Sequence, residues 1–266
     1  MDLKNLLELA IKAAKEASVE ILNVYNSNDF DVESKGDHSP LTRADKVSHK
    51  CIVKILEQTN IPILSEEGKD IPFNERKNWN HLWIVDPLDG TKEFIKRNGE
   101  FTVNIALVEN GKPILGVVAV PVEGKVFYGA EGQAFVDENN KATQLYFHSS
   151  STIAKGIRVV ASRSHLNEET SQFIESLKEP VLVSRGSSLK FMLLAEGKAD
   201  VYPRFAPTME WDTAAPHAIL NQIGIKVYQK DSKEELSYNK RKLTESFIHL
   251  SMTCDTNSCW YRLAIP

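Results

Sequence analysis

The sequence predicts a mixed α/β (α+β) protein in which helices and sheets pack in layers. Three observations support this fold class: a long amphipathic segment at the N-terminus, a series of strands in the middle, and alternating strands and helices after them. The 266 residues suit one large domain or two intimate halves. The net charge of −4 provides no basic excess that would attract nucleic acid or an anionic membrane.

Two helices are expected before residue 60. Apolar side chains recur at helical spacing between Leu3 and Tyr25, which predicts one long helix with a single buried face. The segment 26–40 is polar and is expected to be extended or loop. A second helix is predicted from Thr42, because Thr42 and Asp45 have the spacing of a capping box.

Short apolar runs then predict the strands of a sheet. Ile61–Leu64 is one such run, and Leu82–Val85 is a second that we expect to end abruptly at Asp86–Pro87. Between Phe101 and Val136, β-branched residues alternate with turn residues, which predicts an antiparallel meander.

A polar stretch, Asp137–Ser151, is the expected boundary between two halves. The N-terminal α+β half, residues 1–140, would carry most of the metal ligands, and the C-terminal α/β half, residues 141–266, would carry substrate specificity and Asp212. In the second half, strands and helices alternate. We expect strands at 157–161, 181–184 and 199–202, and helices at 168–177, 187–196 and 212–222.

Carboxylate side chains stand where the predicted strands end. Glu66 and Glu67 follow one strand, Asp86 and Asp89 follow the next, and Asp212 stands at the expected N-cap of a helix. Ligands of layered α/β proteins commonly bind at such a sheet edge. Converging carboxylates repel each other by about 4 kcal/mol at ~4 Å, so such a cluster needs a cation. Oxygen ligands without His or Cys favour magnesium over zinc.

The segment Asp86-Pro87-Leu88-Asp89-Gly90-Thr91 suits this chemistry. The proline keeps the chain out of a helix, so the two aspartates can converge with the Leu88 carbonyl as a third oxygen. Gly90 would let a phosphate approach the backbone, and Thr91 adds a hydroxyl. Taken singly, these acids are equally typical of turns and helix caps, and their joint occurrence favours a site.

Three segments also resemble the lithium-sensitive, magnesium-dependent phosphatase superfamily, which includes inositol monophosphatases, fructose-1,6-bisphosphatases and 3′(2′),5′-bisphosphate nucleotidases. They are Ser65–Glu67, Asp86–Thr91 and Trp211–Ala215. The longer string Asp86–Pro121 is similar to the bacterial nucleotidase branch, as are segments 162–165, 186–191 and 202–205. The resemblance runs from about residue 2 to about 247, and the tail 248–266 matches no known pattern. It implies a layered αβαβα sandwich of the inositol monophosphatase / fructose-1,6-bisphosphatase type.

The resemblance also implies a set of site residues. One magnesium ion would bind Glu66, Asp86 and the Leu88 carbonyl, a second would bind Asp86, Asp89 and Asp212, and a third, weaker ion would lie near Glu66. Asp45 and Thr91 would orient and deprotonate the attacking water, and Glu67 would position rather than ligate. The residues that contact substrate would be Glu66, Asp89, Gly90, Thr91, His165, Ser187, Lys190, Arg204 and Asp212.

The implied activity is removal of the 3′-phosphate of adenosine 3′,5′-bisphosphate, giving AMP and phosphate, with inhibition by lithium. Action on 3′-phosphoadenosine 5′-phosphosulfate would link the protein to sulfate assimilation. Two alternatives stay open: an inositol or sugar phosphatase, and a nucleotide- or metal-binding regulator without turnover. The sequence lacks a P-loop and a Gly-x-Ser-x-Gly elbow, which disfavours P-loop nucleotide binding and serine acyl chemistry.

The expected location is the cytoplasm, because the chain begins with an amphipathic helix and has no apolar run of about 18 residues. The three cysteines do not form a disulfide framework. A peripheral association with the cytoplasmic face of the inner membrane stays open. The expected assembly is a monomer or weak dimer, with a small nucleotide bisphosphate as substrate and no nucleic acid partner.

Overall fold

A seven-stranded sheet forms the centre of the protein. The structure is a computed structural model that describes residues 1–27, 30–36, 40–147, 156–161, 167–229, 232, 234–245 and 247–251. The strands follow the order β3-β4-β5-β6-β7-β8-β9, and only the β3–β4 pair among them is parallel. Their bounds are β3 Ile63–Ser65, β4 His81–Asp89, β5 Thr102–Glu109, β6 Lys112–Val120, β7 Lys125–Ala130, β8 Gln133–Glu138 and β9 Lys141–Leu145. The predicted meander is confirmed.

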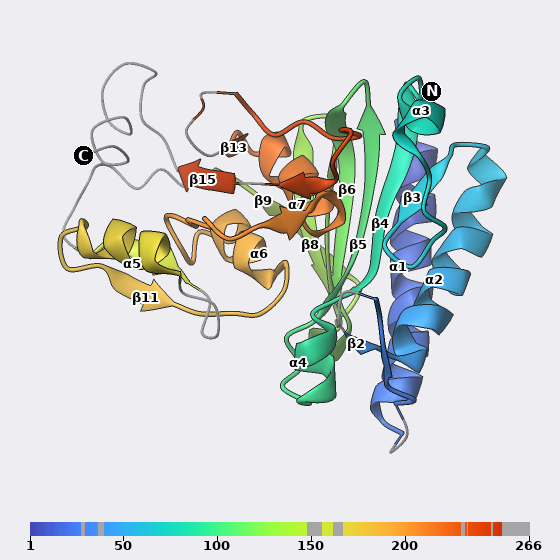
Figure 1. Cartoon of the computed structure of the whole chain (residues 1–266), viewed down its shortest axis with the longest axis horizontal. Helices are drawn as coiled ribbons and strands as arrows, with labels where there is room; N and C mark the ends of the chain where they lie inside the picture. The colour runs from blue at the N-terminus through green and yellow to red at the C-terminus, as the bar shows by residue number, and fades with distance from the viewer. Residues whose placement is uncertain are drawn as a thin grey trace.

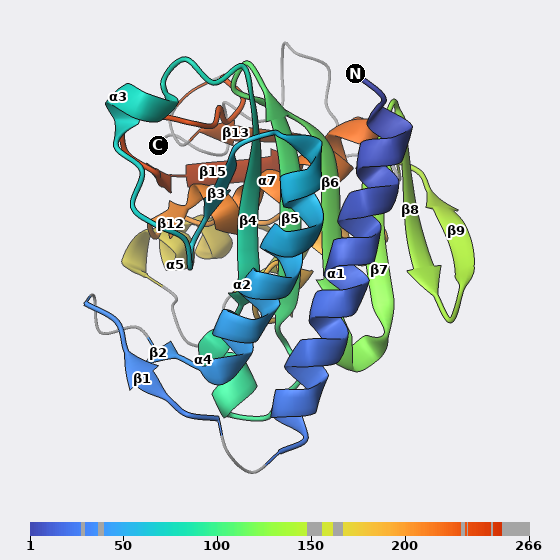
Figure 2. The same cartoon turned by 90° about the vertical axis from the view of Figure 1, so that its right-hand side faces the viewer.

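Helices cover both faces of this sheet. Helices α1 (Leu3–Tyr25) and α2 (Arg43–Leu56) pack on one face, and α6 (Leu189–Ala195) and α7 (Glu210–Gln222) pack on the other (Figures 1 and 2). Alternate residues of a strand point to opposite faces, so Trp83 belongs to the first core and Ile84 to the second. On β6, a Cβ at Gly116 would come within 2.2 Å of the Ala215 carbonyl, so glycine permits the close approach of α7.

A smaller layer lies beyond α6 and α7, on the side away from the sheet (Figure 1). It contains β10 (Arg158–Val160), β11 (Val181–Val183), β13 (Lys226–Gln229) and β15 (Phe247–Ser251), with helix α5 (Glu168–Glu175) outside them. This succession of layers agrees with the expected αβαβα sandwich. The remaining elements are β1 Glu33–Ser34, β2 Pro40–Leu41, η1 Glu57–Thr59, α3 Phe73–Arg76, α4 Thr91–Ile95, η2 Pro121–Glu123, β12 Thr208–Met209 and β14 Thr244–Glu245.

The structure corrects the predicted end of β4. The strand does not stop at Asp86 but continues to Asp89, with Asp86 paired to Asn104 and Asp89 to Thr102. Three residue steps on β4 therefore match two on β5, which is a β-bulge. Backbone pairing continues past Val85, because the bulge accommodates the proline. The end of the continuous apolar run was therefore a poor guide to the end of the strand.

Two predictions in the second half are also corrected. The expected strand at 199–202 is reduced to a single bridge between Val159 and Val201. Helix α7 begins at Glu210 with Met209 as its N-cap residue, so Asp212 is the third helical residue rather than the cap. Its carboxylate still serves the helix end, because it reaches back and accepts the backbone N–H of Met209 at 3.1 Å.

The predicted division into residues 1–140 and 141–266 stays a prediction, although β9 extends the central sheet beyond residue 140 by pairing with β8. In the divergent tail, β15 pairs with β13, and residues 252–266 lie outside the described part of the chain. None of the helices in the described residues combines the length and apolar character needed to span a bilayer.

Candidate active site

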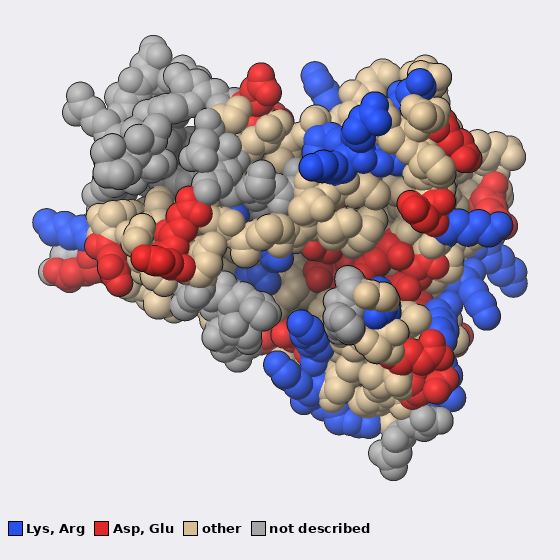
Figure 3. All heavy atoms as spheres, viewed as in Figure 1, with Lys and Arg blue, Asp and Glu red and all other residues tan. Residues whose placement is uncertain are grey.

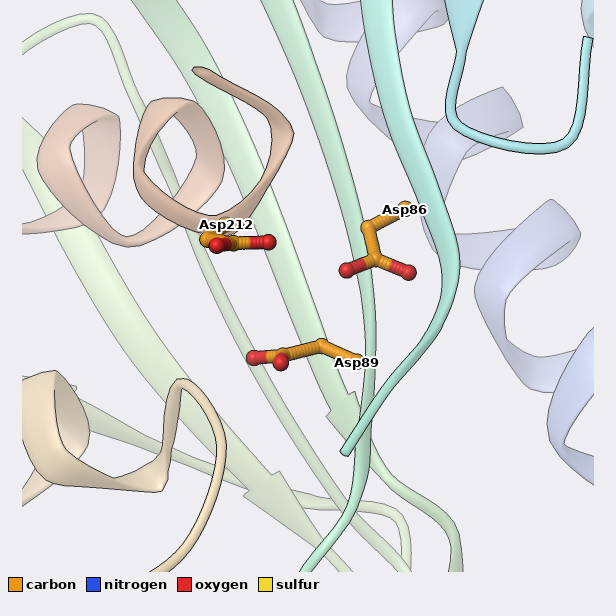
Figure 4. A group of neighbouring side chains, drawn as sticks. All are labelled: Asp86, Asp89 and Asp212. Carbon is orange, nitrogen blue, oxygen red and sulfur yellow. The ribbon is translucent and has the colours of Figure 1, made fainter. Parts of the chain in front are cut away.

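Three carboxylates meet where β4 faces the start of α7. Asp86, Asp89 and Asp212 each place an oxygen so that all three oxygens lie within 4.8 Å of one another (Figure 4). Asp86 is 1% exposed, so solvent screens its charge poorly. Burying three like charges together is unfavourable unless a cation or protons compensate them. The all-oxygen donor set fits a hard divalent ion such as magnesium.

The bulge of β4 and the first turn of α7 position these acids. Asp86 Oδ1 accepts the backbone N–H of Leu88 at 3.0 Å, which fixes the turn inside the bulge. Asp212 Oδ2 accepts from Met209 and from the Thr208 hydroxyl. Gly90 adopts φ 94°, where a Cβ would meet the Glu100 carbonyl at 3.1 Å, so the chain needs glycine after Asp89.

Asp45 and Thr91 also meet, as the resemblance implies. Thr91 Oγ1 lies 3.2 Å from Asp45 Oδ1 and 3.3 Å from the Leu88 carbonyl oxygen. The other oxygen of Asp45 accepts the N–H and hydroxyl of Thr42 at 2.7 and 2.6 Å, which confirms the predicted capping interaction. Asp45 therefore caps the start of helix α2 with one oxygen and contacts Thr91 of the candidate site with the other.

Glu66 lies outside the group of three, and a lysine that the sequence reasoning missed contacts it. Lys35 Nζ donates to Glu66 Oε1 at 2.8 Å and also to Glu67. Burial lowers the pKa of Lys35, but the two glutamates outweigh this effect and raise it. Lys35 lies in a polar loop with no motif around it, so the sequence offered no signal beyond its charge.

Burial and mutual repulsion raise the pKa of three acids at the site. Burial raises the pKa of Glu66 to about 7, with Asp212 and Glu67 adding to the rise and Lys35 opposing it. Burial also raises the pKa of Asp86, assisted by Glu66, Asp89 and Asp212. Burial and then Asp89 raise the pKa of Asp212. A divalent ion binds the deprotonated carboxylates, so its affinity rises with pH.

We expect Asp86→Asn to be more stable than the wild type in metal-free buffer at pH 8. A raised native pKa adds stability below the unfolded-state value near ~4, and this stability is lost as pH rises through the native pKa. The asparagine does not titrate, so its advantage should grow between pH 5 and pH 8, reaching on the order of 1 kcal/mol. Urea unfolding in EDTA measures it. An advantage that is equal at both pH values would contradict the prediction.

A cavity of about 430 Å³ opens beside the acids. Asp89 and Asp212 line one side of it, and Lys190 and Arg204 also line it. Figure 3 shows acidic atoms gathered along the middle of this face with basic atoms beside them in a hollow. Lys190 is 6% exposed and its Nζ lies 5.9 Å from the centroid of the Tyr202 ring. Ser187 lines the cavity too, whereas His165 lies outside the described residues.

Most of the chain, including the segments that carry the acid cluster, matches a family model. Residues 2–255 match the inositol monophosphatase family. The chain belongs to this family. Since the match reaches residue 255, it includes the beginning of the segment that the sequence resemblance left unassigned.

Individual relatives are similar over nearly their whole length. The chain is 46% identical over 248 residues to the 3′(2′),5′-bisphosphate nucleotidase CysQ of Salmonella typhimurium, covering 92% of this chain and 97% of that protein. The crystal structure of CysQ from Bacteroides thetaiotaomicron, a bacterial member of the inositol monophosphatase family, is 45% identical, with a TM-score of 0.84 over 93% of this chain and 97% of that one. Staphylococcal inositol monophosphatase-1, solved as a lithium-chloride-soaked inhibitory complex, is 21% identical with a TM-score of 0.77, covering 95% of this chain and 91% of that one.

Proposed function

We propose that this chain is a magnesium-dependent 3′(2′),5′-bisphosphate nucleotidase that converts adenosine 3′,5′-bisphosphate to AMP and phosphate. We further propose that it acts on 3′-phosphoadenosine 5′-phosphosulfate and serves sulfate assimilation in the cytoplasm. The observation that carries the proposal is the 46% identity to a nucleotidase of this name over 97% of that protein. The convergence of Asp86, Asp89 and Asp212 beside a cavity that Lys190 and Arg204 also line supports it. A monomer or weak dimer stays the predicted assembly.

The donor set fits magnesium because three carboxylates, with buried Asp86 among them, share one point and offer only oxygen. Asp86, Asp89 and Asp212 would hold one ion, and Glu66 with Asp86 and the Leu88 carbonyl would hold another. Bound magnesium supplies charge neutralisation and Lewis acidity for phosphoryl transfer. The Lys35 ammonium lies 2.8 Å from Glu66 Oε1 and already supplies one positive charge that compensates the Glu66 carboxylate.

The remaining steps belong to side chains of this chain. Asp45 Oδ1 accepts a hydrogen bond from the Thr91 hydroxyl, which leaves a lone pair of the Thr91 oxygen free to accept a hydrogen bond from the attacking water. Burial raises the pKa of Asp45, which makes it a stronger base than an exposed aspartate. As water attacks phosphorus in line, its proton passes through Thr91 towards Asp45. The bond between phosphorus and the ribose 3′-oxygen breaks, and that oxygen takes a proton from solvent to give the 3′-hydroxyl of AMP.

A substrate panel tests this proposal. We expect faster phosphate release from adenosine 3′,5′-bisphosphate, measured as kcat/KM with magnesium, than from inositol 1-phosphate or fructose 1,6-bisphosphate. EDTA should abolish release, and submillimolar to millimolar lithium should inhibit it, in line with the lithium complex of the staphylococcal relative. Preference for inositol 1-phosphate would support the sugar phosphatase alternative. Binding of the bisphosphate without phosphate release would support a regulator.

Replacing Lys190 by methionine should weaken binding of the non-reacting phosphate without affecting the reacting one. Lys190 Nζ is the buried cation that we assign to the non-reacting phosphate, so its loss should raise KM for adenosine 3′,5′-bisphosphate about 10- to 100-fold with little change in kcat. Inositol 1-phosphate lacks a second phosphate and serves as the control substrate. An equal rise in KM for both substrates would remove Lys190 from this role.

A further inference from the structure

Two buried polar residues interrupt an otherwise apolar strand next to the acid cluster. Thr102 and Asn104 are both 0% exposed, and the neighbouring residues Val103 and Ile105 belong to the hydrophobic core. A buried polar side chain is unfavourable unless it is hydrogen-bonded. The register of β5 places Thr102 opposite Asp89 and Asn104 opposite Asp86, so both polar residues flank the candidate ligands.

These two residues are linked to Asp89 by Ser187 and Ser188, which immediately precede α6. Asn104 Nδ2 donates to Ser188 Oγ at 2.8 Å, and Ser188 Oγ lies 2.7 Å from Asp89 Oδ2. In parallel, Thr102 Oγ1 lies 2.7 Å from Ser187 Oγ, which lies 2.8 Å from the same carboxylate oxygen. The backbone N–H of Ser188 donates to this oxygen as well, at 2.7 Å.

The hydroxyl protons of both serines can point towards Asp89. Ser188 receives a hydrogen bond from the Asn104 amide, so its own proton is free to donate. Of its two acceptors, Asp89 Oδ2 at 2.7 Å is closer than the Asp212 carbonyl oxygen at 3.1 Å. Thr102 Oγ1 lies 3.1 Å from Asn104 Oδ1 and 2.7 Å from Ser187 Oγ; if it donates to the nearer Ser187, the Ser187 proton is likewise directed to Asp89. Asp89 Oδ2 then accepts three hydrogen bonds, which fixes the orientation of the carboxylate.

We propose that Asn104 and Ser188 are positioning residues that hold Asp89 in the orientation required for divalent ion binding. The inference rests on the proposed magnesium site and adds residues that were not among its expected ligands or substrate contacts. It also changes the role of the Ser187 hydroxyl. A hydroxyl that donates to Asp89 has no proton left for a phosphate, so Ser187 supports Asp89 rather than the substrate.

The test is manganese binding to the full chain at pH 7.5, followed by electron paramagnetic resonance of free Mn²⁺, with Mg²⁺ as competitor. We expect Ser188→Ala to raise the Mn²⁺ dissociation constant about 10- to 100-fold, as for other groups that orient metal ligands. Asn104→Leu, which keeps the volume and removes the donor, should shift it in the same direction. The double variant should be no weaker than Ser188→Ala alone, because both changes break one chain of hydrogen bonds.

A matched control separates this role from a structural one. Thr59→Ala also removes a hydroxyl that is hydrogen-bonded to the sheet, because Thr59 Oγ1 accepts from Trp83 Nε1 at 3.0 Å near the other end of β4. It should leave Mn²⁺ binding unchanged. For the positioning variants, raising Mg²⁺ should restore most of the lost kcat, and urea unfolding in EDTA reports their metal-free stability.

The outcomes are distinguishable. If the unmodified protein binds Mn²⁺ and both Ser188→Ala and Asn104→Leu bind it equally tightly, the inference is overturned and the proposed function still stands. Loss of stability without a change in Mn²⁺ affinity would overturn it too. No Mn²⁺ binding by the wild type would overturn the metal site and this inference together. If Ser188→Ala does not fold, Asn104→Leu alone decides by the same comparison.

Discussion

Asp212→Asn is expected to lower kcat for phosphate release from adenosine 3′,5′-bisphosphate about a thousandfold. The neutral amide oxygen can still accept from Thr208 and Met209, so the first turn of α7 keeps its hydrogen bonds. The change removes one negative charge from the point where three carboxylates meet. A loss of about 4 kcal/mol of transition-state stabilisation, the scale of metal-ion catalysis, corresponds to this factor.

The measurement is single-turnover phosphate release at saturating magnesium, with thermal unfolding in EDTA as the check on folding. Asp2→Asn is the matched control, because Asp2 also accepts a backbone N–H at a helix start, from Asn5 at 3.1 Å, but lies outside the acid cluster. It should keep full activity. Turnover of Asp212→Asn near that of the wild type would show that the converging carboxylates are not an ion site.

Thr91→Val is expected to lower kcat about 10²- to 10⁴-fold, the usual contribution of a general base. Valine preserves the shape of the side chain but removes the hydroxyl that links Asp45 to the attacking water. Asp45→Asn should cause a similar loss. Because both residues act on one proton, the double variant should be little worse than either single variant.

Thr91→Ser provides the control, since it restores the hydroxyl and should recover activity to within about tenfold. The Thr91 variants also avoid the capping role of Asp45, which binds Thr42 through its other oxygen. The pH profile adds a second measurement: the acidic limb that reports the base should be absent in Thr91→Val. An unchanged kcat for Thr91→Val would exclude the Asp45–Thr91 pair from proton transfer.

Local patterns predicted the features that local interactions determine. The capping box of Thr42 and Asp45 and the meander after Phe101 depend on neighbouring residues, and both are present. The convergence of Asp86 and Asp89 also followed from a six-residue motif. The bulge between them did not, because it is set by the register of β4 against β5.

Contacts between distant segments were the ones that sequence reasoning missed. Lys35 reaches Glu66 from a loop with no distinctive pattern, so only the folded chain reveals the pair. The position of Asp212 was misjudged because capping rules look for a polar N-cap, and here Met209 occupies it. Asn104 did leave a signal, since an amide inside the apolar run Val103–Val108 needs a buried partner.

The acid cluster joins chain segments that are made at very different times during protein synthesis. Asp212 is made 123 residues after Asp89, so it leaves the ribosome well after Asp86 and Asp89. A nascent chain that stalls before α7 therefore lacks one carboxylate of the ion site, even if its central sheet has already formed. The ion site formed by Asp86, Asp89 and Asp212 should therefore be complete only after α7 has been made, and products truncated before α7 should not hydrolyse phosphate esters.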